Sequence, residues 1–298
     1  MKIILHLGAH KTATTYIQNG LSVSADALNK HEVYIVPTID FRNSIKKINK
    51  NSHPINRFAL VRSWRASQLY QDYLRQAKKA SCSRMVISEE GFLGSIHQLT
   101  NEGRFYQHEK LKRNLIPCVS HLKGHPITAM LAVRSYDSFF TSAWCQTVKE
   151  QGYRTFDEAL KKQLMLLKRG WFDVISDILN ILPESSQLRV WRLEDFKKDE
   201  NSVFSELVGS GNVGHMTLPK KNMLPGLSKQ AVTQLENLQL RGEPSPRPVV
   251  LEMVKKYSKF KGFDDFSPWD EVEKGVLVER YAADIARIRA QWPDIMIH

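Results

Sequence analysis

Five short apolar runs, separated by amphipathic helical patterns, constrain the fold of this chain more than any other feature. The runs, predicted as strands, cover residues 2–7, 33–37, 84–88, 127–133 and 188–193. Most are continuously apolar, as expected when both faces of a strand are covered. Strands that alternate with helices imply a parallel sheet with right-handed crossovers. The sequence therefore predicts an α/β fold with a parallel sheet flanked by helices.

Helical periodicity predicts the elements between and after these strands. The predicted helices cover residues 14–29, 62–79, 109–123, 136–150, 156–182, 228–241, 247–260 and 272–292. Segments 38–57 and 209–227 lack clear periodicity and are predicted as long irregular loops. No internal repeat is present, so one domain is expected over residues 1–298. Its core would span about residues 1–230, followed by a C-terminal helical extension over about 228–298.

The chain is basic, with 43 Lys and Arg residues against 31 Asp and Glu and a net charge of +12. This balance favours an anionic partner, although a basic protein without a specific ligand is the alternative. Because the basic residues are spread out and no zinc-finger or RNA-binding pattern occurs, no nucleic-acid partner is expected.

Cysteine usage and hydropathy bear on location. Cys82, Cys118 and Cys145 are scattered and lack metal-ligand spacing, which favours a reducing, cytoplasmic compartment. The N-terminal apolar run is too short for a secretory signal. No segment approaches the roughly 20 apolar residues of a membrane span, so no transmembrane segment is expected.

The segment 6–18 lies where the first strand turns into a helix. Backbone N–H groups and the helix dipole favour an anion at such a position. Lys11 would supply positive charge, and Thr12, Thr14 and Thr15 would supply hydroxyl donors. The predicted ligand is a phosphate group.

The length of this loop distinguishes it from a Walker A loop, which needs G-x-x-x-x-G-K-[ST]. Here Gly8 precedes Lys11 by only three positions, and no glycine stands directly before the lysine. The loop is therefore too short to wrap a β,γ-phosphate pair and fits a cradle for a single phosphate.

Residues 8–15, Gly-Ala-His-Lys-Thr-Ala-Thr-Thr, resemble the 5′-phosphosulfate loop of the bacterial-type sulfotransferases. Those enzymes use 3′-phosphoadenosine 5′-phosphosulfate (PAPS) on a P-loop NTPase-like fold, and their loop usually reads Gly-x-x-Lys-Thr-Gly-Thr-Thr. Ala13 is the departure, and because alanine suits helical dihedrals the loop is expected to keep its form. The resemblance implies donor binding by Gly8, His10, Lys11, Thr12, Ala13, Thr14 and Thr15.

A second resemblance begins where the fourth predicted strand ends. Sulfotransferases hold the 3′-phosphate of the donor with an Arg at this strand end and a Ser eight residues later. Arg134 and Ser142 reproduce that spacing, with Tyr136 where the family often has proline. An Arg fork can grip two phosphate oxygens.

Two later segments also resemble the family. Residues 190–196 match the end of its last core strand, and their acidic pair, Glu194 and Asp195, is interpreted as structural. Lys220, Lys221 and Asn222 resemble a loop of related enzymes, made of basic residues followed by asparagine, that closes over the adenosine of the donor. A solvated charge cluster is the alternative for these three.

The resemblance implies transfer of a sulfonate from PAPS to an acceptor hydroxyl or amine, releasing 3′,5′-adenosine bisphosphate and using no metal. Lys11 would offset the charge that builds on the leaving phosphate. The base would come from the end of the third strand, where the family pattern favours Glu90 over Glu89. The alternative is that these acids cap the next helix.

Histidine is the rival base. His10 lies in the loop and is expected to pack or hydrogen-bond there. Surface or packing roles are expected for His31, His53, His97 and His108.

Basic residues after the second strand predict an acceptor groove for an anionic glycan, with a solvated basic face as the alternative. They are Arg42, Lys46, Lys47, Lys50, Arg57, Arg62 and Arg65, beside Trp64. Two other functions compete with sulfonate transfer. A P-loop nucleotide kinase or NTPase would need the Walker A spacing, and a non-catalytic polyanion-binding protein would leave the ordered motifs unexplained. The sequence leaves the oligomeric state open.

Overall fold

The computed structural model describes residues 1–50, 57–219 and 226–297, with the side chains of 49–50 and 57–63 left out. Its centre is a five-stranded, entirely parallel sheet in the order β2-β3-β1-β4-β5. The strands are β1 (Lys2–His6), β2 (Val33–Ile35), β3 (Arg84–Ser88), β4 (Ile127–Val133) and β5 (Gln187–Arg192). The predicted parallel α/β class is confirmed, and every predicted strand is present.

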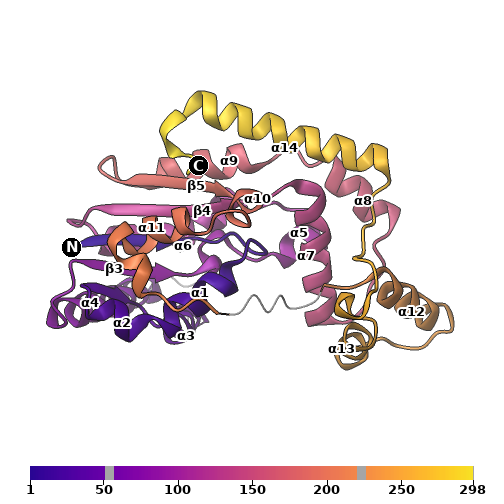
Figure 1. The fold of residues 1–298 in the computed structure, drawn as a ribbon, viewed down its shortest axis with the longest axis horizontal. Helices are drawn as coiled ribbons and strands as arrows, with labels where there is room; N and C mark the ends of the chain where they lie inside the picture. Colours follow the sequence, from indigo (N-terminus) through magenta and orange to yellow (C-terminus); the bar gives the residue numbers. More distant parts are fainter. Residues whose placement is uncertain (51–56, 220–225, 298) are drawn as a thin grey trace.

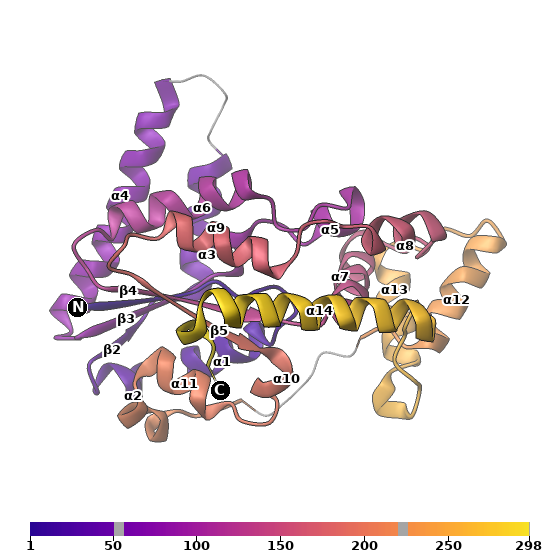
Figure 2. The same ribbon diagram turned by 90° about the horizontal axis from the view of Figure 1, so that it is seen from above.

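Helices cover both faces of the sheet (Figure 2), because alternate side chains of each buried strand point to opposite faces. Ile3 and Leu5 face the larger core cluster, whereas Ile4 faces the smaller one. The larger cluster is covered by α3 (Thr38–Lys50), α4 (Arg57–Lys79), α6 (His108–His121) and α9 (Trp171–Ile181). The smaller is covered by α1 (Thr14–Val23), α2 (Ala25–Asn29), α10 (Leu193–Phe196) and α11 (Asn201–Val208).

The C-terminal helices pack against α7 (Tyr136–Gln151), which leaves the end of β4 (Figure 1). Helices α12 (Lys229–Leu240) and α13 (Arg247–Lys256) bury Trp144 and Val148 of α7 in a third cluster. Helix α14 (Glu271–Gln291) then runs back along the molecule to the sheet. There the Ile297 N–H donates to the Val190 carbonyl oxygen at 2.7 Å.

Three predictions about helices are wrong. Segment 38–50 is the helix α3, because Phe41, Ile45 and Ile48 recur at helical spacing and pack against the larger core cluster. The predicted helix 14–29 is interrupted at Ser24. The predicted helix 156–182 is two helices, α8 (Glu158–Met165) and α9.

Gly170, just before α9, explains the second break. A Cβ atom at this position would lie 2.4 Å from both Asp284 Oδ2 and Tyr136 Oη, so only glycine fits. The backbone of Gly170 is extended, with φ −138° and ψ −164°, so the helical path is broken before α9. Segment 209–219 contains only the short 3₁₀ helix η2 (Ser210–His215). In the parts of the chain that are described, none of the helices combines the length and apolar character of a membrane span.

Candidate functional site

The loop that joins β1 to α1 lies at the carboxyl edge of the sheet, between the ends of β3 and β4. Beyond β1, the Leu7 N–H still donates to the Met130 carbonyl at 2.9 Å, and the Ala132 N–H donates to Gly8. Gly8 has a φ of +92°, and a Cβ there would lie 3.0 Å from the Glu90 Cβ atom. Open parallel sheets bind their ligands at this edge.

Ala13 corrects an expectation from the sequence. It precedes α1 with φ 64° and ψ 15°, in the left-handed region rather than in helical dihedrals. An alanine pays about 1 kcal/mol for this conformation, whereas glycine adopts it freely. Helix α1 nevertheless starts normally, since the Ile17 N–H donates to the Ala13 carbonyl at 3.1 Å.

The loop threonines do not share one role. The hydroxyls of Thr12 and Thr14 both donate to the Ala9 carbonyl at 2.7 Å, so they hold the loop together. Thr15 is exposed. No described side chain caps the start of α1, so its first N–H groups stay available to an anion. All three threonine hydroxyls were expected to donate to the phosphate, and Thr15 is the one whose hydroxyl is not already bonded to the Ala9 carbonyl.

Arg134, at the end of β4, braces the same loop. Its Nη1 donates to the Lys11 carbonyl at 2.8 Å, and its Nε donates to Ser138 Oγ at 2.9 Å. Ser142, predicted from its spacing, is half-buried one turn farther along α7. Ser138 was not predicted. Its position four residues after Arg134 was the signal that could have revealed it.

The Lys11 ammonium lies among other cations. Burial, with the nearby charges of Lys149 and Arg134, lowers the pKa of Lys11 from 10.5 to about 8. Its Nζ donates to the neutral Gln146 Oε1 at 3.3 Å. Within the described residues, neither Lys11 nor Arg134 forms an ion pair.

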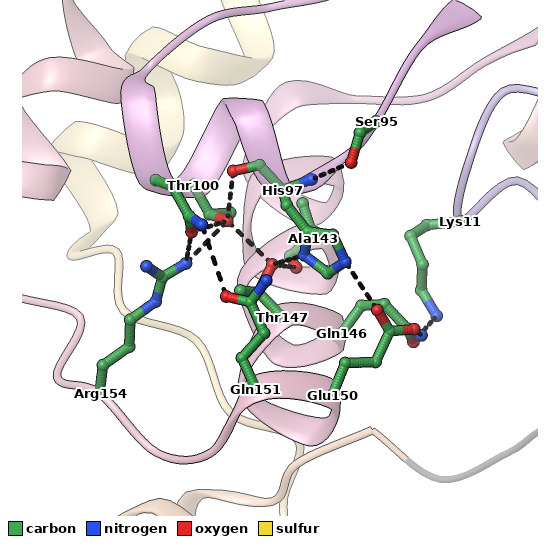
Figure 3. A network of polar contacts seen from close by, with 11 residues as sticks. Lys11, Ser95, His97, Thr100, Ala143, Gln146, Thr147, Glu150, Gln151 and Arg154 are labelled. Atoms are coloured by element: carbon green, nitrogen blue, oxygen red, sulfur yellow. Dashed lines mark hydrogen bonds and ion pairs between the residues drawn. The ribbon is translucent and has the colours of Figure 1, made fainter. Parts of the chain in front are cut away.

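A polar network continues from Lys11 along α7 to α5 (His97–Glu102) (Figure 3). Gln146 Nε2 donates to Glu150 Oε1, and Glu150 Oε2 lies 2.7 Å from His97 Nε2. His97 Nδ1 lies 3.1 Å from Thr147 Oγ1. The sequence predicted a surface or packing role for His97 and gave no indication of Gln146 or Glu150. Their spacing of four residues was visible, but their proximity to Lys11 arises only in the fold.

The two acids after β3 face different partners. Glu89 Oε2 lies 2.7 Å from Arg42 Nε, and Glu89 Oε1 accepts the Gly91 N–H at 2.8 Å, so Glu89 caps the 3₁₀ helix η1 (Glu90–Leu93). Glu90 lies against Gly8 of the loop. Burial raises the pKa of Glu90, opposed by the charges of Arg42 and Lys11. The capping interpretation therefore fits Glu89, and Glu90 is the acid beside the loop.

His10 is tied to Tyr106. The His10 backbone N–H donates to Tyr106 Oη at 3.2 Å, and His10 Nδ1 lies 3.0 Å from the same oxygen. Burial lowers the pKa of His10 to about 4, so its ring is neutral near pH 7. The expected packing role is confirmed. Of the other histidines, His108 pairs with Asp177, His31 stacks on His215, and His53 lies outside the described residues.

The structural interpretation of Glu194 and Asp195 is confirmed. Glu194 accepts the Ser135 N–H and the Tyr281 hydroxyl, each at 3.1 Å. Asp195 lies 3.1 Å from Arg192 Nε. Both acids hold the chain around the end of β5 in place.

The predicted acceptor groove is only partly assembled. Arg42 and Lys46 line a cavity beside Glu89, whereas Lys47, Trp64 and Arg65 are exposed elsewhere. The side chains of Lys50, Arg57 and Arg62 lie outside the described part of the chain. The same holds for all of Lys220, Lys221 and Asn222.

Across the described ranges, no cluster of three or more His, Cys, Asp or Glu side chains is arranged to hold a metal ion. Comparison of the chain with protein-family models, curated proteins and solved structures finds no match. The residues gathered at the edge of the sheet are therefore the basis for inferring its function.

Proposed function

We propose that this protein transfers a sulfonate group from PAPS to an acceptor hydroxyl or amine. The observation that carries the proposal is the pairing of Lys11 and Arg134 at the uncapped start of α1. Both cations are partly buried, and neither has an ion-pair partner among the described residues. Glu90 near Lys11, and Glu194 and Asp137 near Arg134, offset only part of their charge. Burying such charge is expensive unless an anion joins it. A doubly phosphorylated donor has the complementary charge.

The residues present fit such a donor. The 5′-phosphate would lie at the start of α1, held by Lys11, Thr15 and the first N–H groups of the helix. The 3′-phosphate would pair with Arg134 and, by its family position, Ser142. The P-loop-like sulfotransferase fold, suggested by the motifs, belongs to the same proposal.

In the proposed reaction PAPS supplies the sulfonate and a phosphate leaving group. Glu90 takes the proton of the acceptor hydroxyl, while the acceptor oxygen forms a bond to sulfur and the sulfur–oxygen bond to the phosphate breaks. Lys11 stabilises the charge left on that phosphate. The raised pKa of Glu90 strengthens it as a base, provided it is ionised at the working pH.

Calorimetric titration tests donor binding. We expect 3′,5′-adenosine bisphosphate to bind without Mg²⁺ and more tightly than ATP–Mg²⁺. Arg134→Met should weaken this binding by about 30-fold, the usual loss when one partner of a buried charge pair is truncated. The exposed Arg241 on α12 supplies the control Arg241→Met, which should leave affinity unchanged.

A preference for ATP–Mg²⁺ would instead favour the nucleotide kinase or NTPase alternative. Equal, weak binding of every polyanion would favour the non-catalytic alternative. Transfer of radiolabelled sulfate from PAPS to a panel of hydroxyl acceptors then tests catalysis directly. Wild-type protein that binds the bisphosphate but transfers no label to any acceptor would refute the catalytic part of the proposal.

A further inference from the structure

A cavity of about 430 Å³ lies between α3, α4, η1 and α6, on the Glu89 side of the strand end. Its walls are largely apolar, with Ile45 and Ile48 from α3, Tyr70 from α4, Phe92 from η1 and Ile116 from α6. Cavities of this size hold small organic molecules, and apolar walls bind the apolar part of a ligand. A wholly hydrophilic sugar would leave most of this lining without complementary contacts.

The charged groups of the cavity are mainly cationic. Arg42 and Lys46 come from α3 and Arg113 from α6, whereas Glu89 is the acid in the lining. Glu89 is already paired with Arg42 and bonded to Gly91. Lys46 and Arg113 therefore leave an excess of positive charge at the rim, where both side chains are exposed.

The Arg42 guanidinium adds to this positive charge. Arg42 Nη2 is buried and finds no hydrogen-bond partner among the described residues, although its Nε is paired with Glu89. A buried guanidinium donor without a partner is costly. Glu89 therefore satisfies only part of this guanidinium.

We propose that this cavity binds an amphipathic anion, a molecule with an apolar body and one carboxylate, sulfate or phosphate group. Glu89 and Gly91, the neighbours of Glu90, both line the cavity. A molecule bound there lies against the same turn of chain as the proposed base. This placement makes it the acceptor, a role that rests on the proposed function. The apolar lining favours such an acceptor over the anionic glycan expected from the sequence.

Two fluorescent probes with the same apolar body test the charge requirement. 8-Anilinonaphthalene-1-sulfonate carries a sulfonate, and N-phenyl-1-naphthylamine lacks it. We expect the sulfonate probe to bind at one site and about tenfold more tightly, as one charge-assisted hydrogen bond would give. Equal affinity of the two probes would overturn the proposal.

Matched variants locate the site. Arg113→Gln should weaken binding of the sulfonate probe by about fivefold and leave the neutral probe unchanged. Lys112→Gln, the control on the same helix, removes the same charge from a residue outside the cavity lining and should change neither affinity. If both variants weaken binding equally, the effect reflects overall charge and the site is wrong. Thermal melts of each variant establish that the fold is intact.

A final titration separates this proposal from the proposed function. Saturating 3′,5′-adenosine bisphosphate should leave the affinity for the sulfonate probe within about twofold, because no residue of the donor loop lines the cavity. Competition between the two ligands would overturn the cavity assignment. Failure of the bisphosphate to bind, with probe binding still dependent on Arg113, would instead refute PAPS as donor and remove the acceptor role.

Discussion

Two polar clusters meet at the start of α7 and differ in how their charges are balanced. Arg134 belongs to the candidate site. The next two residues, Ser135 and Tyr136, belong to a second cluster, in which they bond to Glu194 and to Asp284 of α14. We term this cluster, which also includes Tyr281 of α14, the α14 clamp. In the α14 clamp both carboxylates accept hydrogen bonds from groups of the protein. Glu194 accepts two hydrogen bonds, and Asp284 accepts the Tyr136 hydroxyl at 2.5 Å.

The candidate site is built the opposite way. Lys11 and Arg134 donate only to neutral oxygen atoms in the hydrogen bonds assigned among the described residues. The charge of Arg134 also contributes to lowering the pKa of Lys11. A cluster that only holds a fold together gains nothing from unbalanced charge, because burying it costs stability. Such an imbalance is therefore typical of a site shaped for a ligand.

Lys11→Met gives the sharpest test of this contrast. Sulfonate transfer should fall by about 10²–10³-fold or more, since the methionine cannot offset charge on the leaving phosphate. The free energy of unfolding at pH 7 should nevertheless rise, by about 1–3 kcal/mol, because a partly buried cation is removed. Denaturant unfolding and single-turnover assays measure both. A variant that is less stable, or that transfers at the normal rate, would contradict the contrast.

The pH dependence of that stability gain has a fixed sign. The pKa of Lys11 is about 8 in the folded protein against an ordinary 10.5. The penalty from the charged form is complete below pH 8 and fades as the pH rises towards 10.5. The difference in stability between Lys11→Met and the wild type should shrink over that range.

Asp284→Ala should break the clamp without touching the charges of the candidate site. The Tyr136 hydroxyl and the Phe172 N–H, which donates to the same carboxylate, lose their acceptor. We expect the free energy of unfolding to fall by about 2–3 kcal/mol. The exposed Glu279 on the same helix supplies the control, Glu279→Ala, which should have little effect. Equal losses in both variants would mean that the clamp has no special part in stability.

Raising the pH should weaken binding of 3′,5′-adenosine bisphosphate. Lys11 loses its proton in the free protein as the pH passes about 8, so affinity should drop by up to about tenfold per pH unit above that value. The decline ends where the bound complex also deprotonates. Titrations between pH 7 and 9.5 measure it. In Lys11→Met, affinity should be low and nearly constant over the same range, and an unchanged slope would assign the effect to another group.

Ala13→Gly should have the smallest effect. Glycine adopts the left-handed conformation of this position without the steric cost that alanine pays. Greater freedom of the unfolded chain offsets part of the gain. We expect the free energy of unfolding to rise by about 0.5–1 kcal/mol. Destabilisation of the glycine variant, measured by denaturant unfolding, would show that the left-handed conformation is not costly here.

The sequence predicted the sheet well because its signal is local. Each strand is a short apolar run, and strands interrupted by helices leave a parallel arrangement as the simplest solution. The same logic placed Lys11, Arg134 and Glu90 at one edge, because each follows the carboxyl end of a strand. The helix α3 was missed although Phe41, Ile45 and Ile48 recur at helical spacing. The break at Gly170 had no local signal, because it depends on contacts with Tyr136 and Asp284.

Contacts between distant segments were decided by the tertiary structure. His97 joins the Lys11 network through Glu150 from another helix, and Glu89 pairs with Arg42. Such contacts depend on how helices pack, which residue spacing along one chain does not encode. The sequence by itself determined which strand ends carry chemistry. The tertiary structure alone decided which charges are balanced, because the partner of a buried charge often lies far away in the sequence.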